Sequence, residues 1–150
     1  MSSKRPGLLR DARVFAEALF SREDGPPPSS RLDWAMTELD DFLDHGGPRV
    51  ELLMRGGLAL ATWAAPPLAG KAPPLARLSI ADRRVALDKL EHTPAGLPLL
   101  AVKATLCFIW YEHQDTLREI GVLQGDDAEA AEPGCLVTLK TRARAAGAAQ

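Results

Sequence analysis

The sequence predicts an all-α fold, an irregular array of five to six helices with proline-rich loops and a flexible C-terminal tail. Leu and Ala dominate the 150 residues and aromatic residues make up only 5%, which favours helices over a β-sandwich. Between clusters of proline and glycine, the apolar residues recur with the period of a helix. These clusters, at residues 25–30, 46–48 and 66–74, predict the breaks between helices. The first and third exceed the usual connections of a bundle, so we expect an irregular array.

The first half of the chain predicts three helices. The first carries Leu8 and Phe15 on one apolar stripe. The second begins at Ser30 or Asp33, either of which suits an N-cap. The third follows Pro48, because proline is favoured in the first helical turn, and runs through residue 61.

The second half predicts three more helices. The fourth opens with Ser79 and Asp82 in a variant of the capping box. The fifth covers residues 99–113, and the sixth covers residues 116–120 and ends at Gly121, a residue suited to the left-handed conformation. On the fifth helix we expect one apolar stripe facing the core, formed by Leu100, Ala104, Cys107, Phe108 and Tyr111.

These helices are expected to form a single domain over residues 1–121, with residues 122–150 as a C-terminal arm and flexible tail. In that tail an acidic stretch at residues 126–132 precedes a basic, alanine-rich end. Residues 136–139 suggest one strand or an arm that packs on something else. Little in the last ten residues would repay the entropy of ordering them.

Composition excludes several function classes. A net charge of −2 argues against a nucleic-acid binder with a basic face. Two cysteines form no disulfide framework, and the sequence has no phosphate-binding loop, nucleophile elbow or close histidine pair. We therefore predict no catalytic, cofactor-binding or metal-ligating residues in this chain. No long apolar segment is present, so we expect no direct membrane insertion.

Several single residues have a structural and a functional interpretation. His45, His92 and His113 lie near predicted helix ends, where a cation offsets the helix dipole, and we prefer this role to metal binding. Cys107 is interpreted as a buried free thiol, and Lys103 as a side chain that extends along the surface or pairs with an acid. For the tryptophans, core packing is the first expectation and an interface anchor the second; they are Trp34, Trp63 and Trp110.

A more specific pattern spans residues 75–121. Its features are a helix start at Leu78 and Ser79, then Arg83, Leu87 and Leu90, a turn at residues 93–99, Lys103, the aromatic pair Trp110 and Tyr111, then Leu117, Ile120 and Gly121. This region resembles the helical small subunit of membrane-associated gluconate dehydrogenases, the gluconate 2-dehydrogenase subunit 3 family. It also resembles a helical region of long-chain alcohol oxidases in the glucose-methanol-choline (GMC) flavoprotein group.

The resemblance implies a noncatalytic accessory subunit that binds and stabilises an FAD-dependent GMC-type alcohol, sugar or steroid oxidoreductase. FAD is then expected in the partner subunit and not in this chain. Exported relatives carry a twin-arginine signal that is not found here, so we expect a cytoplasmic complex. The residues matched to the family pattern or flanking it, which we expect at the partner interface, are Arg83, Lys103, Trp110, Tyr111 and His113.

Two other functions remain open at this stage. One is a stand-alone helical small-molecule-binding protein or enzyme, with a pocket between helices lined by the three tryptophans. The other is a helical regulator or scaffold that docks through the acidic stretch and the basic tail.

Overall fold

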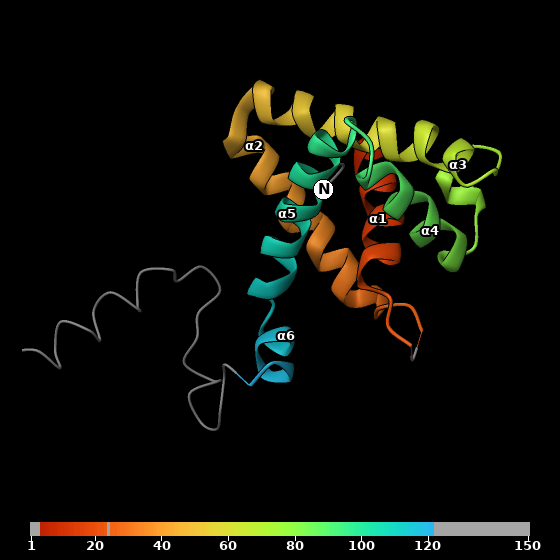
Figure 1. Cartoon of the computed structure of the whole chain (residues 1–150). Helices are drawn as coiled ribbons and strands as arrows, with labels where there is room; N and C mark the ends of the chain where they lie inside the picture. Colours follow the sequence, from red (N-terminus) through yellow and green to blue (C-terminus); the bar gives the residue numbers. More distant parts are fainter. Residues whose placement is uncertain (1–3, 24, 122–150) are drawn as a thin grey trace, which may run out of the picture. The chain divides into compact units, whose positions relative to one another are not determined.

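The structure, a computed structural model, describes residues 4–23 and 25–121. The elements in chain order are α1 (Pro6–Phe20), α2 (Ser29–Ala59), the π-helix η1 (Leu60–Ala64), α3 (Ala65–Leu68), the 3₁₀-helix η2 (Leu75–Arg77), α4 (Ile80–Glu91), α5 (Gly96–Glu112) and α6 (Gln114–Glu119). Among the described residues no strand is present apart from one isolated bridge between Arg22 and Gly25. The predicted all-α class is confirmed (Figure 1). The predicted arm and tail at residues 122–150 lie outside the described part of the chain.

The chain divides into two compact units, residues 1–113 and 114–150. The first holds α1 to α5 and the hydrophobic core. Of the second, the structure describes α6 and the residues just after it, where Gly121 adopts a φ of 75° as its sequence position predicts. A domain boundary at residue 121 stays a prediction.

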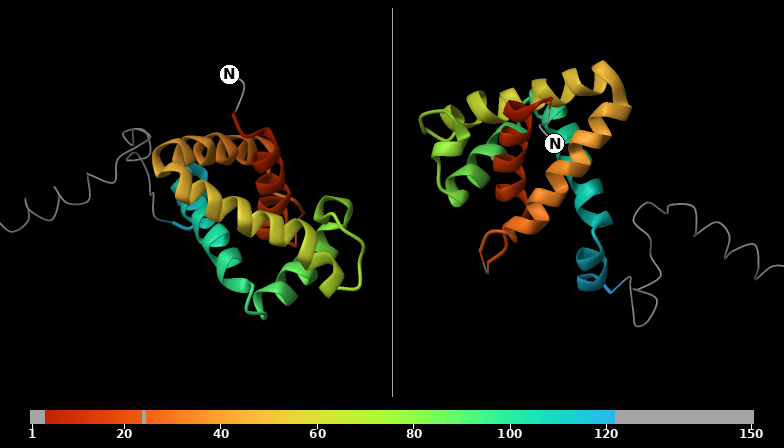
Figure 2. Two further views of the ribbon diagram at one scale, coloured as in Figure 1. Left: turned by 90° about the horizontal axis from the view of Figure 1, so that it is seen from above. Right: turned by 180° about the vertical axis from the view of Figure 1, so that it is seen from behind.

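The longest element, α2, contains a sharp bend where the sequence predicts a break between two helices. Gly47 has φ 76° and ψ −178°, which interrupts the helical geometry, and Pro48 then begins the next helical turn. The two arms therefore meet without an intervening loop, as the views of Figures 1 and 2 show. The helix begins at Ser29 after Pro28, and neither predicted cap, Ser30 nor Asp33, occupies the N-cap position.

Arg5 joins the two arms of this bend. Its guanidinium donates hydrogen bonds to Asp44 and Asp40 on the first arm, at 2.8 and 3.1 Å, and to Glu51 on the second arm, at 2.8 Å. Glu51 also accepts a hydrogen bond from Arg55 at 2.6 Å. These bonds hold the pKa of the Asp44 and Glu51 carboxyl groups below their usual range. One side chain thus restrains the angle between the arms.

Past the second arm of α2, the helix continues through η1 into α3 without a turn. The backbone N–H of Ala65 bonds to the carbonyl of Leu60, the wider spacing of a π-helix. The extra residue shifts the helical phase, and Trp63 is 60% exposed. Core packing is therefore the wrong expectation for Trp63, while Trp34 is half-buried and Trp110 is buried.

The start of α4 follows its local sequence signal. Ser79 is the N-cap, and its Oγ accepts a hydrogen bond from the Asp82 backbone N–H at 3.2 Å. The Ser79 hydroxyl also donates to the Asp82 carboxylate at 3.0 Å. After a short turn, α5 begins at Gly96, where an added Cβ would lie 2.4 Å from the Glu91 carbonyl oxygen. Glycine is thus required at this corner.

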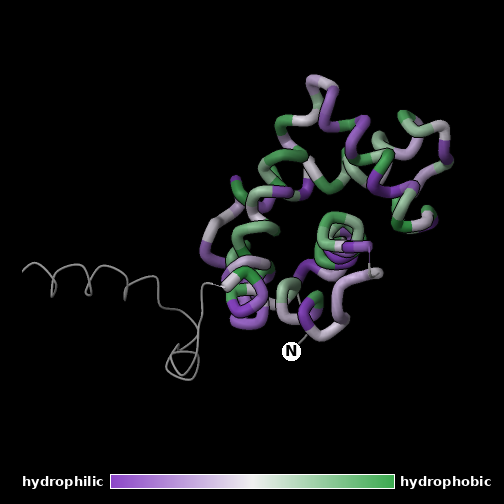
Figure 3. Tube along the Cα trace, turned by 60° about the horizontal axis from the view of Figure 1, so that its bottom comes forward, coloured by the Kyte–Doolittle hydropathy of each residue, from purple (hydrophilic) through white to green (hydrophobic). Residues whose placement is uncertain are grey.

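The core of the first unit lies where α1, both arms of α2, α4 and α5 meet. Hydrophobic and hydrophilic residues are interleaved along these helices (Figure 3). The second arm of α2 approaches α5 most closely at Gly57, where an added Cβ would lie 2.5 Å from Val102 Cγ2 and 2.8 Å from the Pro98 carbonyl oxygen. A glycine is needed for this approach because no side chain fits between the helices. The largest fully buried side chains are Phe15, Leu32, Leu39, Leu43, Met54, Leu75, Leu90, Leu99 and Leu106.

Replacing Gly57 by alanine is expected to destabilise the protein. The new methyl group would push against the α5 backbone, and overpacking of this kind costs about 1–3 kcal/mol of the free energy of unfolding. Its neighbour Gly56 is exposed with nothing within 4 Å of an added Cβ, so Gly56→Ala should leave stability unchanged or raise it by up to about 1 kcal/mol. Urea unfolding of both variants tests this, and equal effects would contradict the close approach.

Replacing Arg5 by glutamine is expected to lower the melting temperature at pH 7. The carboxyl pKa values of Asp44 and Glu51 are depressed in the folded state, so their contribution is complete above the ordinary values and is lost as pH falls through the depressed ones. The difference between wild type and Arg5→Gln should therefore shrink as the pH falls below the ordinary carboxyl pKa values of about 4. Thermal melts across this range measure it, and a difference independent of pH would rule out the ion pairs as its source.

Candidate interaction surface

The candidate site is the outward face of α5. The helix is apolar on nearly all sides, and its charged residues are Lys103 and Glu112. Its buried side comprises Gly96, Leu99, Val102, Leu106, Ile109 and Trp110. A helix that is apolar all round is normally buried all round, so the remaining side requires an explanation.

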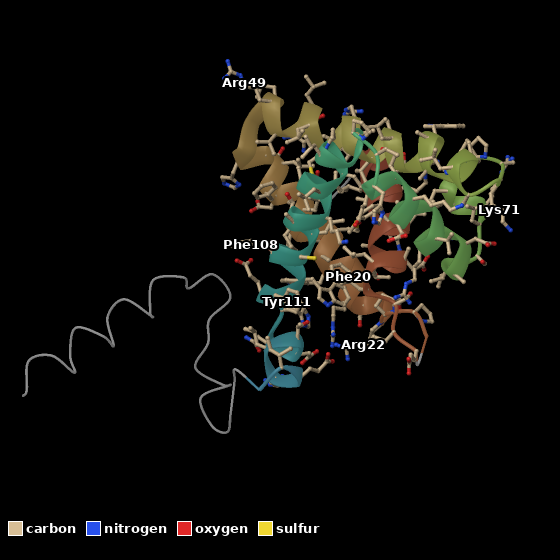
Figure 4. All side chains as sticks on the ribbon, viewed as in Figure 1. Phe20, Arg22, Arg49, Lys71, Phe108 and Tyr111 are labelled. Atoms are coloured by element: carbon tan, nitrogen blue, oxygen red, sulfur yellow. The ribbon has the colours of Figure 1, made fainter. Side chains whose placement is uncertain are left out.

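The exposed side of α5 forms a continuous stripe, here called the α5 face. It consists of Leu97, Leu100, Ala104, Phe108 and Tyr111. The four large residues are 75%, 57%, 59% and 50% exposed in that order. The five residues of the face recur at spacings of three and four, so they lie along one side of the helix over about 21 Å. Figure 4 shows Phe108 and Tyr111 on the side of α5 that points away from α1.

Four of the five α5 face residues belong to the stripe that the sequence assigns to the core. That expectation is wrong: the structure buries the opposite side of α5 and turns Leu100, Phe108 and Tyr111 outward. Because the helix is apolar all round, its own sequence does not determine which side packs inward. The close approach of Gly57 to Pro98 and Val102 determines it.

The aromatic end of α5 is fixed by Trp110. Its ring stacks on Phe20 of α1 with centroids 4.2 Å apart and an interplanar angle of 8°, and the Arg31 guanidinium carbon lies 5.3 Å from the Trp110 ring centre. His113, the C-cap of α5, meets Trp34 edge-on at 4.6 Å. These contacts hold the end of α5 that carries Tyr111.

The other expected interface residues also make internal contacts. Arg83 donates to Glu17 of α1 at 2.6 Å, and to the carbonyls of Leu78 and Ala76 at 2.9 and 3.1 Å. Lys103 donates to Glu91 at 2.7 Å, which confirms the predicted pairing with an acid. Of the five predicted residues, Tyr111 alone lies on the α5 face, and Trp110 is buried. Whether they contact a partner stays a prediction.

The ionisable side chains that the sequence singled out have the following environments. The Nδ1 atoms of His45 and His92 lie 2.9 and 2.7 Å from the carbonyls four residues earlier, contacts that raise the pKa of both imidazoles. Cys107 is half-buried, and burial raises the pKa of its thiol. Within the described residues, no group of three or more His, Cys, Asp or Glu side chains is placed to hold a metal ion.

No described helix combines the length and apolar character needed to cross a membrane. The chain matches no protein-family model, no curated protein and no solved structure.

Replacing Trp110 and Tyr111 by alanine is expected to give opposite results although the two residues are adjacent. Trp110→Ala should cost about 3–5 kcal/mol of unfolding free energy, because a 4% exposed aromatic residue leaves a cavity. Tyr111→Ala should change stability by less than about 0.5 kcal/mol, because its ring is 50% exposed. Urea unfolding measures both, and a comparable loss for Tyr111→Ala would show that its ring packs within the chain.

Proposed function

We propose that this protein is a noncatalytic accessory subunit that binds and stabilises an FAD-dependent GMC-type oxidoreductase acting on an alcohol, sugar or steroid. The observation that supports a binding role is the α5 face, an uncharged apolar stripe presented by a helix held firmly from behind. Covering such a stripe with a partner removes apolar surface from water, which drives association. The enzyme class of the partner rests on the resemblance at residues 75–121.

In this proposal the predicted interface residues have two roles. Tyr111 contacts the partner directly, since half of its surface is exposed on the α5 face. Trp110 and Lys103 act indirectly, because their contacts with Phe20 and Glu91 hold α5 in position. Arg83 similarly ties the start of α4 to Glu17 of α1. The FAD is bound by the partner, and the proposed location of the complex is the cytoplasm.

The proposal is tested by affinity purification of the tagged chain from its own host. The expected eluate contains a larger chain that mass spectrometry identifies as a GMC-type flavoprotein, together with the absorbance of an oxidised flavin. A colourless eluate without such a chain would overturn the proposed partner class. Fractionation of the same cells tests the proposed location, which recovery of the complex outside the cytoplasm would contradict.

A charge on the α5 face should abolish this association. Phe108→Glu is expected to reduce co-purified flavin by about tenfold or more, because a buried unpaired carboxylate costs over about 1.4 kcal/mol in an interface. Val85→Glu is the matched control, since Val85 is 51% exposed on α4, outside the α5 face. Circular dichroism of both variants checks their folding. Equal flavin recovery from Phe108→Glu and Val85→Glu would place the partner elsewhere on the protein.

A further inference from the structure

The helical run that follows the bend of α2 has an exposed side with no role in the proposed function. The run extends from Pro48 through η1 to the end of α3 at Leu68. Its exposed side carries an uncharged stripe, here called the α2–α3 face, which spans about 22 Å along the helix. The stripe consists of Leu52, Gly56, Ala59, Trp63 and Pro67, all of them exposed.

Large apolar side chains on this side of the run lie in water. Leu52 is 72% exposed and Trp63 is 60% exposed. Leu53 and Leu68, which flank the stripe, are 47% and 43% exposed. Trp63 lies in the π-helix η1, a rare turn type that occurs frequently at functional sites. It is the most exposed of the three tryptophans, so the alternative expectation of an interface anchor applies to it best.

The bend at Gly47 also divides α2 by charge. The first arm, residues 29–46, carries five acidic residues and one basic residue. Past the bend, residues 48–71 carry one acidic residue and three basic residues. The basic residues are Arg49, Arg55 and Lys71. Figure 4 shows Arg49 and Lys71 at opposite ends of the run, so the apolar stripe lies between positive charges.

The single acidic residue of the run, Glu51, is neutralised within the protein. Its side chain is 25% exposed and accepts hydrogen bonds from Arg5 at 2.8 Å and from Arg55 at 2.6 Å, so two guanidinium groups share one carboxylate. An anionic surface that approaches the run therefore meets positive charge beside an uncharged stripe.

We propose that the α2–α3 face docks on an anionic lipid surface, with Trp63 and Leu52 in the headgroup region and Arg49 and Arg55 beside the lipid phosphates. A helix that lies on a membrane combines Trp and Leu on its apolar side with Lys and Arg next to them. The indole ring is favoured at the boundary between lipid and water, and an arginine stem covers apolar surface while its guanidinium stays hydrated.

The arrangement of the helices lets a flat surface reach the whole stripe. Figure 1 shows the run along one edge of the first unit, with α1, α4 and α5 all on the same side of it. A plane that touches the outward side of the run therefore meets no other helix of this unit first. The acidic first arm of α2 turns away at the bend, which keeps its carboxylates from opposing the contact (Figure 2).

Lipid docking is independent of the proposed enzyme partner. Gly57 and Val102 approach each other on the buried sides of the run and of α5, so the α2–α3 face and the α5 face both point away from that contact. Both faces can be covered at once. The cytoplasmic leaflet is rich in anionic lipids, so a reversible contact with it agrees with the proposed location.

Sedimentation of the purified full-length chain with lipid vesicles tests the proposal. Binding to phosphatidylcholine vesicles that contain about 30% phosphatidylserine should be at least about tenfold tighter than binding to phosphatidylcholine alone, and salt should weaken it. Arg49→Gln should reduce this preference by about fivefold. No binding to the phosphatidylserine vesicles at low salt overturns the proposal and would leave the face to a protein. Equal binding to both vesicles contradicts the anionic surface.

A pair of aromatic substitutions tests the position of the contact. Trp63→Ser should weaken vesicle binding by at least about fivefold, whereas Trp63→Phe keeps an apolar ring and should retain most of it. Phe42→Ser is the matched control, because Phe42 is a 41% exposed aromatic residue on the acidic first arm of α2. Circular dichroism checks the folding of each variant. Equal losses for Trp63→Ser and Phe42→Ser would show that the α2–α3 face is not the contact.

Fluorescence quenching by lipids brominated in their acyl chains reports on Trp63 directly. The chain has three tryptophans, of which Trp34 is half-buried and Trp110 is buried against Phe20. Vesicle-bound wild type should be quenched, and Trp63→Phe should lose that quenching while it still sediments with the vesicles. Quenching that persists in Trp63→Phe would mean that another tryptophan enters the lipid, against the proposal.

Discussion

The close approach of α2 to α5 at Gly57 is the constraint on which the rest of the first unit depends. Contact with Pro98 and Val102 fixes the rotation of α5 about its own axis. That rotation turns Leu99, Leu106 and the neighbouring buried side chains inward. It also turns Leu97, Leu100, Phe108 and Tyr111 outward, which makes α5 both a core element and an interaction surface. A side chain at residue 57 would force the two helices apart.

Charged residues act in this fold mainly as links between helices. Arg5 connects the N-terminus to both arms of α2, Arg83 connects α4 to α1, and Lys103 connects α5 to the end of α4. Each link involves residues distant in sequence, so it restrains the packing of whole elements and not only a local turn. Lys103 lies outside the α5 face and pairs with Glu91, so no charge on the face opposes association through it.

The functional proposal addresses one physical problem of this fold. A helix with apolar residues on all sides gains stability inside the protein but leaves one side in water. An accessory subunit covers that side with its enzyme.

Local signals in the sequence determined much of the fold. The helical class, the capping of α4 by Ser79, the left-handed Gly121 and the pairing of Lys103 with an acid all follow from residues near in sequence or from side-chain chemistry. A glycine-proline pair also marked the bend of α2, although it did not show that the arms join directly.

Contacts distant in sequence were decided by the tertiary structure alone. The sequence predicted that Leu100, Phe108 and Tyr111 face the core, but α5 is apolar all round, so its period carries no information about which side is buried. The partner of Arg83, Glu17, lies 66 residues away, and the π-helix that carries Trp63 outward has no simple sequence signature. The sequence alone determined that α5 would be a helix, and packing against Gly57 decided which of its sides remains available to a partner.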